Sequence, residues 1–480
     1  MTTEPVRRLS SPIDDGTTAE DLGRVLFMGV GGVGLSGVAR LYATRGLPVS
    51  GSELHDWPSL PELRKLGVTV FRRHDESNLD GIDTVVRSTA HPDDHIELVE
   101  ARRRGLRVLH RSEALAAAMT GRRSIVVAGT HGKTTTTAML TEMLAACGLD
   151  PSFVNGGESA ADGSSGAHGT GEYFVTEADE SDRSFLRYRP DVAILTNIDV
   201  DHLNNYGTIE ALTETFADFC RLTASDGTII VCADDPRAAS VAETLRGEGR
   251  TVVTYGTAAD ADLRVTELAS DVSGVSYHAA RRTADGEIDL GRFTVPVPGV
   301  HLGLNSASVV VTGLVVGLEP DAIRKGLAAF SGVRRRFELR GTERGVRVYD
   351  EYAYHPTAMT AAISTLKGLA GDGRLVVVFQ PYRVYRTRDL RIEIAQALSI
   401  ADRVVVMEVF GPGEELGAGD GGEALAAAVA LPESDKVFVA EWGDVPAVVA
   451  GMVEDGDVVV TMGAPPISLM PTELLAALAP

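Results

Sequence analysis

One stretch constrains the fold of this chain more than any other: an apolar, β-branched run that turns through a glycine-bounded loop into a helical pattern. The run spans residues 124–128, the loop reads Gly-Thr-His-Gly-Lys-Thr-Thr over residues 129–135, and residues 138–144 have helical spacing. In such units backbone N–H groups and the positive helix N-terminus surround phosphate oxygens. We expect Lys133 to reach the β- and γ-phosphates of ATP and Thr134 to bind Mg²⁺.

The loop departs from the strict phosphate-loop spacing at one position. Val127 stands where the pattern G-x-x-x-x-G-K-[ST] would place its first glycine. An ordinary glycine turn before a helix is therefore the alternative interpretation. The flanking strand and helix patterns favour the ATP site.

Length, charge and cysteine content restrict the class of protein. A chain of 480 residues is too long for one core and suggests about three domains. The net charge of −22 argues against nucleic acid or an anionic membrane as partner, but allows a small anionic substrate beside local arginines. Three widely spaced cysteines and an N-terminus without an apolar leader predict a cytoplasmic protein. We expect a monomer or a homodimer.

Residues 1–120 are expected to form a Rossmann-like domain after a polar arm over residues 1–20. Residues 29–34 read G-x-G-x-x-G after an apolar run, and Glu53 follows a second short strand. In dinucleotide sites such glycines admit the pyrophosphate and the acid binds a ribose. A nicotinamide-dependent oxidoreductase is therefore one alternative, and a nucleotide-like domain without NAD is another. Strands are expected at 24–28, 48–50, 68–70, 84–86 and 107–109.

Two further α/β domains are predicted, which makes the whole chain α/β with three domains. Residues 121–331 should form a central domain of the P-loop ATPase type, with an antiparallel insertion at 261–297 and helices at 304–318 and 322–330. Residues 332–480 should form a doubly wound, Rossmann-like domain. The predicted strands of the two domains are 173–176, 192–196, 228–231 and 251–255, then 346–349, 375–379, 404–407, 437–439 and 458–461.

Acidic and histidine side chains follow two strands of the central domain. Residues 177–182 read Glu-Ala-Asp-Glu-Ser-Asp, and His202 ends the segment Thr-Asn-Ile-Asp-Val-Asp-His. Each alone could be a solvated acidic loop or a structural histidine. Because the carboxyl ends of parallel strands meet at one sheet edge, we expect both segments to converge with the phosphate loop.

Several segments together resemble the Mur ligase family of peptidoglycan synthesis. The resemblance covers nearly the whole chain in the family's three-domain order and rests on residues 31–37, 129–135, 177–182, 196–202, 334–338 and 379–388. It implies an ATP- and Mg²⁺-dependent ligase that activates a carboxylate as an acyl phosphate and then forms an amide, releasing ADP and phosphate. Its small-molecule substrates would be a UDP-sugar carboxylate and an amino acid.

The resemblance also implies roles for individual residues. Lys133 would stabilise the γ-phosphate, Thr134 and Glu177 would hold one Mg²⁺, and His202 would hold a second. The implied catalytic residues are Lys133, Glu177, His202 and Arg336. The nucleotide would be bound by Gly129, Thr130, His131, Gly132, Lys133, Thr134, Thr135, Asn305, Arg336 and Glu351. The other substrates would be bound by Gly31, Gly32, Val33, Gly34, Ser36, Glu53, Tyr352, Tyr354, Tyr382, Arg383 and Arg386.

Within the family, the motifs are most similar to the branch that joins L-alanine to UDP-N-acetylmuramate. No lysine lies between residues 134 and 324, so the carbamylated lysine that bridges metals in other branches is absent. The acceptor side departs from the family: Tyr354 and Tyr382 stand where histidines are usual, and Pro465 and Pro466 replace Gly-Asp. A paralogue that joins a different amino acid or carboxylate, for example in secondary metabolism, is therefore an open alternative.

Two classes outside the family are disfavoured. A nicotinamide-dependent oxidoreductase would leave the Lys133 loop and the acids after it without a purpose. A regulatory GTPase would need a guanine-reading motif, and the sequence has none that we recognise.

Overall fold

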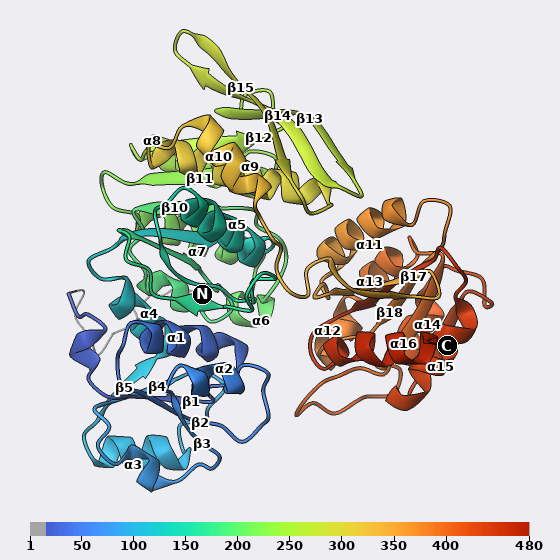
Figure 1. Ribbon diagram of the computed structural model, residues 1–480, viewed down its shortest axis with the longest axis horizontal. Helices are drawn as coiled ribbons and strands as arrows, with labels where there is room; N and C mark the ends of the chain where they lie inside the picture. The colour runs from blue at the N-terminus through green and yellow to red at the C-terminus, as the bar shows by residue number, and fades with distance from the viewer. Residues whose placement is uncertain (1–15, 480) are drawn as a thin grey trace. The chain divides into compact units, whose positions relative to one another are not determined.

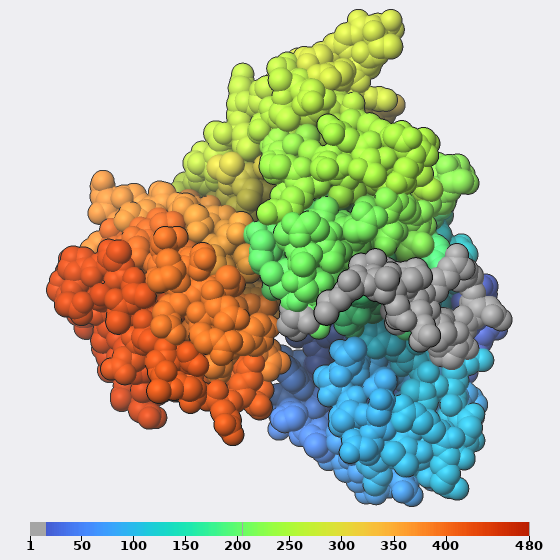
Figure 2. Space-filling view, turned by 180° about the vertical axis from the view of Figure 1, so that it is seen from behind, coloured from blue at the N-terminus to red at the C-terminus, as the bar shows by residue number. Residues whose placement is uncertain are grey.

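The computed structural model describes residues 16–479, which carry colour in Figures 1 and 2. Most of the predicted N-terminal arm, residues 1–15, lies outside this range. The chain divides into two compact units, one of residues 1–267, 277–293 and 304–330 and one of residues 268–276, 294–303 and 331–480. Among residues 16–479, no helix is long and apolar enough to cross a membrane.

The first sheet of unit 1 has five parallel strands in the order β3-β2-β1-β4-β5. The central strand β1 is buried at every position, as the apolar run at 24–28 predicts for a strand covered on both faces. The elements are β1 Val25–Met28, α1 Val33–Thr44, β2 Val49–Ser52, α2 Leu60–Lys65, β3 Thr69–Phe71, β4 Thr84–Arg87, α3 Ile96–Arg103, β5 Arg107–His110 and α4 Arg111–Met119.

The second sheet has ten strands in the order β15-β14-β13-β12-β11-β10-β6-β9-β7-β8. Strands β6, β9, β10, β11 and β12 are parallel to their neighbours in this group. The elements are β6 Arg123–Ala128, α5 Lys133–Ala146, β7 Ser152–Val154, β8 Gly166–Ala167, β9 Tyr173–Glu177, β10 Val192–Leu195, α6 Leu203–Tyr206, α7 Ile209–Arg221, β11 Thr228–Cys232, α8 Pro236–Gly247 and β12 Val252–Gly256.

The predicted insertion forms the far edge of this sheet. Strands β13 Leu263–Asp271, β14 Gly274–Thr283 and β15 Gly286–Val295 follow one another through two-residue connections, which only antiparallel neighbours permit. In Figure 1 the hairpin of β14 and β15 extends away from α9 and α10. These helices span Val300–Val315 and Pro320–Ala328, so each begins a few residues before its predicted start.

The third sheet, in unit 2, has six strands in the order β16-β17-β21-β18-β19-β20. All pairs are parallel except the edge pair β16–β17, and apolar clusters cover both faces, as in a doubly wound fold. The elements are β16 Glu338–Glu343, β17 Val346–Glu351, α11 Pro356–Ala370, β18 Leu375–Phe379, α12 Val384–Asp389, α13 Arg391–Leu398, β19 Arg403–Met407, α14 Gly422–Ala428, β20 Lys436–Val439, α15 Val445–Met452, β21 Val458–Met462 and α16 Met470–Leu478.

The α/β class and the predicted parallel strands are confirmed, whereas β7, β8 and β16 were not predicted. In unit 1, β8 packs against α1 through two glycines. A Cβ on Gly166 would lie 2.3 Å from the carbonyl oxygen of Gly37, and one on Gly37 would lie 2.9 Å from that of Ser165. Only glycine permits this approach of helix and strand. One continuous cluster contains buried side chains of both of the first two sheets, and a separate cluster contains Leu26, Met28 and Val85 of the first sheet.

Candidate active site

The predicted phosphate loop connects β6 to α5, which begins at Lys133 itself. Val127 lies within β6, where it pairs with Ile194 on one side and Glu177 on the other and is fully buried. A glycine is therefore not needed at this position, because the chain leaves the sheet two residues later. Gly132 caps the helix with φ 83°, and a Cβ there would lie 2.8 Å from the side-chain oxygen of Asn305. Asn305 thus lies directly against the loop.

Lys133 holds its ammonium group between the loop and the acidic segment after β9. Its Nζ donates hydrogen bonds to the carbonyl oxygens of Gly129 at 2.6 Å and Thr130 at 3.1 Å, and it lies 2.8 Å from Glu180 Oε2. Burial lowers the pKa of Lys133, but the neighbouring carboxylates, Glu180 foremost, outweigh burial and raise it. Burial raises the pKa of Glu180 to about 7, although Lys133 opposes this rise.

The two residues expected to hold one Mg²⁺ together, Thr134 and Glu177, are in contact. The Thr134 hydroxyl donates a hydrogen bond of 2.7 Å to Glu177 Oε2. Thr134 lies in the first turn of α5, and Glu177 is the last residue of β9, the strand beside β6. Neighbouring parallel strands therefore bring a hydroxyl and a carboxylate, both hard oxygen donors suited to Mg²⁺, to one edge of the sheet.

The segment after β10 closes the other side of the loop. The backbone N–H of His131 donates a hydrogen bond to Asn197 Oδ1 at 2.9 Å, and the side-chain Nε2 of His131 lies 3.0 Å from Asp199 Oδ2. His202 occupies the N-cap of α6 in a left-handed conformation, with Nε2 3.7 Å from Asp201 Oδ2. The structure thus places His202 after the strand next to β6 and gives it an acidic partner.

The glycine-rich loop of the first sheet is held by the acid predicted to bind substrate. Glu53 is buried. Its carboxylate accepts one hydrogen bond from the Gly31 N–H at 3.2 Å and a second from the His55 N–H at 2.9 Å. Gly32 caps α1, and the first turn of the helix exposes Val33 and buries Ser36. Glu53 therefore fixes the conformation of the loop that contains Gly31.

The acidic segment after β9 also contacts α4 of the first sheet. Asp179 Oδ2 lies 2.6 Å from Arg111 Nη2, and Asp182 Oδ2 lies 3.4 Å from His110 Nε2. Burial raises the pKa of Asp179, but Arg111 and then Lys133 outweigh it and hold the pKa at about 2. The side chain of Arg111 in turn packs beside Gly34, where a Cβ would lie 3.6 Å from the Arg111 Cδ.

In unit 2, the predicted nucleotide residues Arg336 and Glu351 lie together. Arg336 Nη1 is 3.7 Å from Glu351 Oε1, and its guanidinium lies 4.9 Å from the centroid of the Tyr352 ring. Glu351 also accepts hydrogen bonds from the backbone N–H groups of Phe337 at 2.9 Å and Ala353 at 3.1 Å. Burial raises the pKa of Glu351, against the opposing effect of Arg336.

The two tyrosines that replace family histidines belong to one aromatic cluster in unit 2. The ring of Tyr354 lies 5.6 Å from that of Tyr352 and 5.8 Å from that of Tyr382. The guanidinium of Arg386 lies 4.7 Å from the Tyr354 centroid, and that of Arg383 lies 5.3 Å from the Tyr382 centroid. These are distances typical of cation–π contacts. The structure therefore brings together five of the predicted substrate-binding residues.

Three contacts at the site were not predicted: Glu180 to Lys133, Asp199 to His131, and Arg111 to Asp179. Glu180 and Asp179 belong to the acidic motif that was already expected to lie near the phosphate loop. A carboxylate partner for Lys133 could therefore have been sought within this motif. Arg111 is the first residue of α4, far in sequence from Asp179, and no local sequence pattern indicates that the two side chains pair.

The fold and this loop, with its lysine, threonine and strand-end carboxylates, define a ligase, and the chain belongs to the Mur ligase family. Three models of that family match it in succession: "Mur ligase family, catalytic domain" at residues 24–123, "Mur ligase middle domain" at 127–313, and "Mur ligase, glutamate ligase domain" at 335–465.

Individual relatives narrow the comparison to one branch of the family. The chain is 62% identical over 461 residues to the UDP-N-acetylmuramate–L-alanine ligase of Salinispora arenicola, which covers 96% of this chain and 89% of that protein. It is 45% identical over 460 residues to the protein of that name from Acidothermus cellulolyticus, with 96% of each chain covered. The crystal structure of UDP-N-acetylmuramate–alanine ligase from Thermotoga maritima matches with a TM-score of 0.79 and 26% identity, covering 94% of this chain and 98% of that one.

Proposed function

We propose that this enzyme joins L-alanine to the carboxylate of UDP-N-acetylmuramate at the expense of ATP, a step in peptidoglycan precursor synthesis. Identity of 62% to a UDP-N-acetylmuramate–L-alanine ligase over nearly the whole chain supports the substrates. One observation of the structure carries the reaction type: the Thr134 hydroxyl and the Glu177 carboxylate meet at the start of the helix that Lys133 opens.

The residues present fit ATP with Mg²⁺. Thr134 Oγ1 and Glu177 supply hard oxygen donors and would hold one Mg²⁺, and His202 would hold a second. The ion would neutralise phosphate charge during transfer. Lys133 stays protonated because carboxylates surround it, so it offers a fixed positive charge to the γ-phosphate.

In the proposed reaction, an oxygen of the muramyl carboxylate attacks the γ-phosphorus and ADP leaves, which gives an acyl phosphate. The α-amine of L-alanine then attacks the carbonyl carbon, inorganic phosphate leaves, and the amine loses a proton. Lys133 would stabilise charge in the first step. Arg383 and Arg386 would bind the acyl phosphate or the incoming carboxylate, because guanidinium groups pair with such oxygens bidentately.

A second candidate keeps this chemistry and changes the acceptor. The observation that favours it is the cluster of Tyr354 and Tyr382 with Arg386 over the Tyr354 ring. A tyrosine offers one hydroxyl where a histidine offers a titratable ring. A paralogue with this cluster would accept a different amino acid or carboxylate.

Phosphate release with UDP-N-acetylmuramate and a panel of amino acids distinguishes the two. ATP-dependent phosphate release that requires UDP-N-acetylmuramate and is fastest with L-alanine is the expected result. Turnover that is fastest with another amino acid would favour the altered acceptor. If no amino acid supports turnover on this sugar nucleotide, the proposed substrates are wrong.

We further propose a cytoplasmic enzyme that acts as a monomer or homodimer on small molecules. Free cysteines at positions 147, 220 and 232 support a reducing compartment. The net charge of −22 is unsuited to nucleic acid or an anionic membrane as a partner.

A further inference from the structure

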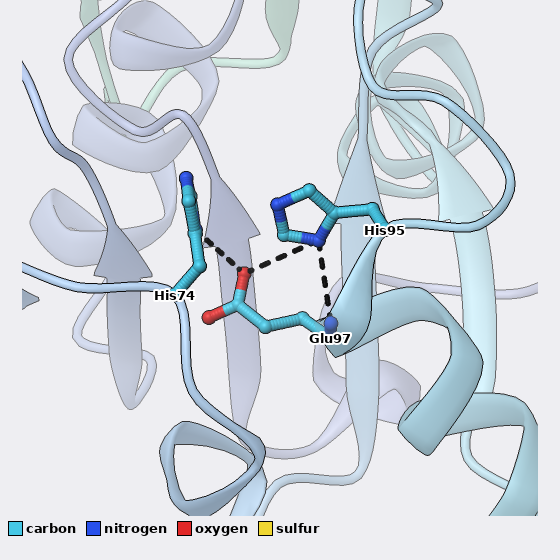
Figure 3. Close-up of side chains that lie close together, drawn as sticks. All are labelled: His74, His95 and Glu97. Atoms are coloured by element: carbon cyan, nitrogen blue, oxygen red, sulfur yellow. Dashed lines mark hydrogen bonds and ion pairs between the residues drawn. The ribbon is translucent and has the colours of Figure 1, made fainter.

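A second group of potential metal ligands lies in the first sheet's domain, apart from the Thr134–Glu177 pair. His74, His95 and Glu97 each present one ligand atom, and these three atoms all lie within 4.8 Å of one another. Figure 3 shows the imidazoles of His74 and His95 on either side of the Glu97 carboxylate, each joined to it by a dashed line. The proposed ligase chemistry makes no use of this group.

The topology of the sheet creates the group. His74 follows β3, and His95 lies after β4 as the N-cap of α3, whose second residue is Glu97. Strands β3 and β4 lie on opposite sides of the central pair β2–β1. Residues from separate connections therefore meet at the carboxyl ends of parallel strands, where α/β folds place their ligands.

The donor atoms are spaced for a single small ion. His74 Nδ1 lies 3.1 Å from Glu97 Oε2, and His95 Nδ1 lies 4.0 Å from the same oxygen. Two ligands of one tetrahedral Zn²⁺ are about 3.4 Å apart, because Zn–N and Zn–O bonds are about 2.0–2.2 Å long. The ring centroids of the two histidines are 4.4 Å apart. His95 Nδ1 also caps α3 by accepting a hydrogen bond of 3.3 Å from the Glu97 N–H, so the His95 ring must rotate and give up this bond to bind the ion.

Buried partners orient the carboxylate from behind. Glu97 is fully buried, its Oε2 accepts a hydrogen bond from Ser52 Oγ at 2.8 Å, and its Oε1 accepts one from Asn78 Nδ2 at 2.7 Å. Ser52 and Asn78 are themselves buried. Outer partners of this kind fix the direction of a metal-binding carboxylate.

We propose that His74, His95 and Glu97 form a binding site for a transition-metal ion of the Zn²⁺ class. Two imidazoles and one carboxylate are a donor set that Zn²⁺ accepts, whereas Mg²⁺ prefers a set made mostly of oxygen ligands. A bound ion would join the connections after β3 and β4 through α3 and stabilise this sheet edge. The proposal does not depend on the proposed ligase reaction.

Equilibrium dialysis of chelator-treated, full-length protein against Zn²⁺ in excess Mg²⁺ tests the site, with absorption of bound Co²⁺ as a second measurement. One Zn²⁺ per chain and the intense visible bands of four-coordinate Co²⁺ are expected. His74→Ala and His95→Asn should each weaken binding at least tenfold, the second while keeping a residue able to cap α3. Ser52→Ala, which retains all three ligands, should weaken it by about tenfold.

His278→Ala is the matched control, because His278 belongs to β14 and pairs there with Asp289. This variant should bind Zn²⁺ as the unmodified protein does. Zn²⁺ should also raise the unfolding temperature of the unmodified protein and of His278→Ala, but not that of His95→Asn. The proposal is overturned if the protein binds no Zn²⁺, or if binding is unchanged in both His74→Ala and His95→Asn.

Discussion

Replacement of Glu180 by glutamine decides whether the buried ion pair with Lys133 stabilises the protein. Glu180 is 2% exposed and lies 2.8 Å from the lysine Nζ. Burial of a carboxylate costs free energy of desolvation, and the attraction of a single cation can be smaller than this cost. The elevated pKa of Glu180, about 7, indicates that burial is the larger effect here.

The size and sign of the effect follow from this pKa. A rise from the ordinary 4.5 to about 7 corresponds to about 3 kcal/mol, at about 1.4 kcal/mol for each pH unit. Between these pH values the folded protein binds more protons than the unfolded chain, so its stability falls as the pH rises. Glutamine resembles the protonated acid at every pH. Glu180→Gln should therefore match the unmodified protein near pH 4.5 and exceed its stability by about 3 kcal/mol above pH 7.

Urea unfolding of both proteins at pH 5 and pH 8 measures this difference, because shifts common to both proteins cancel. Glu172→Gln is the control: Glu172 has a side chain that is 60% exposed, and its replacement should change the free energy of unfolding by less than about 0.5 kcal/mol. If Glu180→Gln is instead less stable than the unmodified protein at pH 8, by the roughly 3–5 kcal/mol expected for a broken buried ion pair, the reasoning is refuted.

Three further predictions concern activity. Lys133→Ala should abolish ATP-dependent phosphate release while the far-ultraviolet circular dichroism is retained; near-normal turnover would contradict the phosphate-loop assignment. Glu177→Gln should raise the Mg²⁺ concentration needed for half-maximal activity by about tenfold or more, measured by Mg²⁺ titration at saturating ATP, and an unchanged titration would remove Glu177 from the metal site. Tyr354→His combined with Tyr382→His should change the relative rates across an amino-acid panel, and an unchanged profile would place both rings outside the acceptor pocket.

The sequence predicted the fold wherever a strand is central and apolar. Strands such as β1, β10 and β18 are buried at every residue, so their continuous apolar runs are visible without the structure. Edge strands lack this signal. β16 is mostly accessible, and β8 has only two residues, one of them Gly166. The pairing of these edge strands depends on contacts with residues distant in sequence, and a local sequence pattern does not indicate such contacts.

The site was predictable to the extent that its residues follow strands in recognisable motifs. Thr134 and Glu177 were expected to meet, and they are in hydrogen-bond contact. The partner of Lys133 was not expected, because the sequence alone does not say which acid of residues 177–182 turns inward. Glu180 does so, and Asp179 turns to Arg111 instead. The predicted roles of the site residues and the three domain boundaries remain predictions.

The acidic segment after β9 has a consequence for how ligand binding at the phosphate loop and at the glycine-rich loop is coupled. Glu177 and Glu180 contact the phosphate loop, whereas Asp179 contacts Arg111, which packs beside Gly34 of the glycine-rich loop. The segment of residues 177–182 is therefore connected both to the phosphate loop and, through Arg111, to the glycine-rich loop. Free-energy coupling between sites is reciprocal, so any displacement of this segment by ATP would alter affinity at the glycine-rich loop by the same factor as occupancy there alters affinity for ATP. We expect the two ligands to bind interdependently, with one short segment as the means of communication.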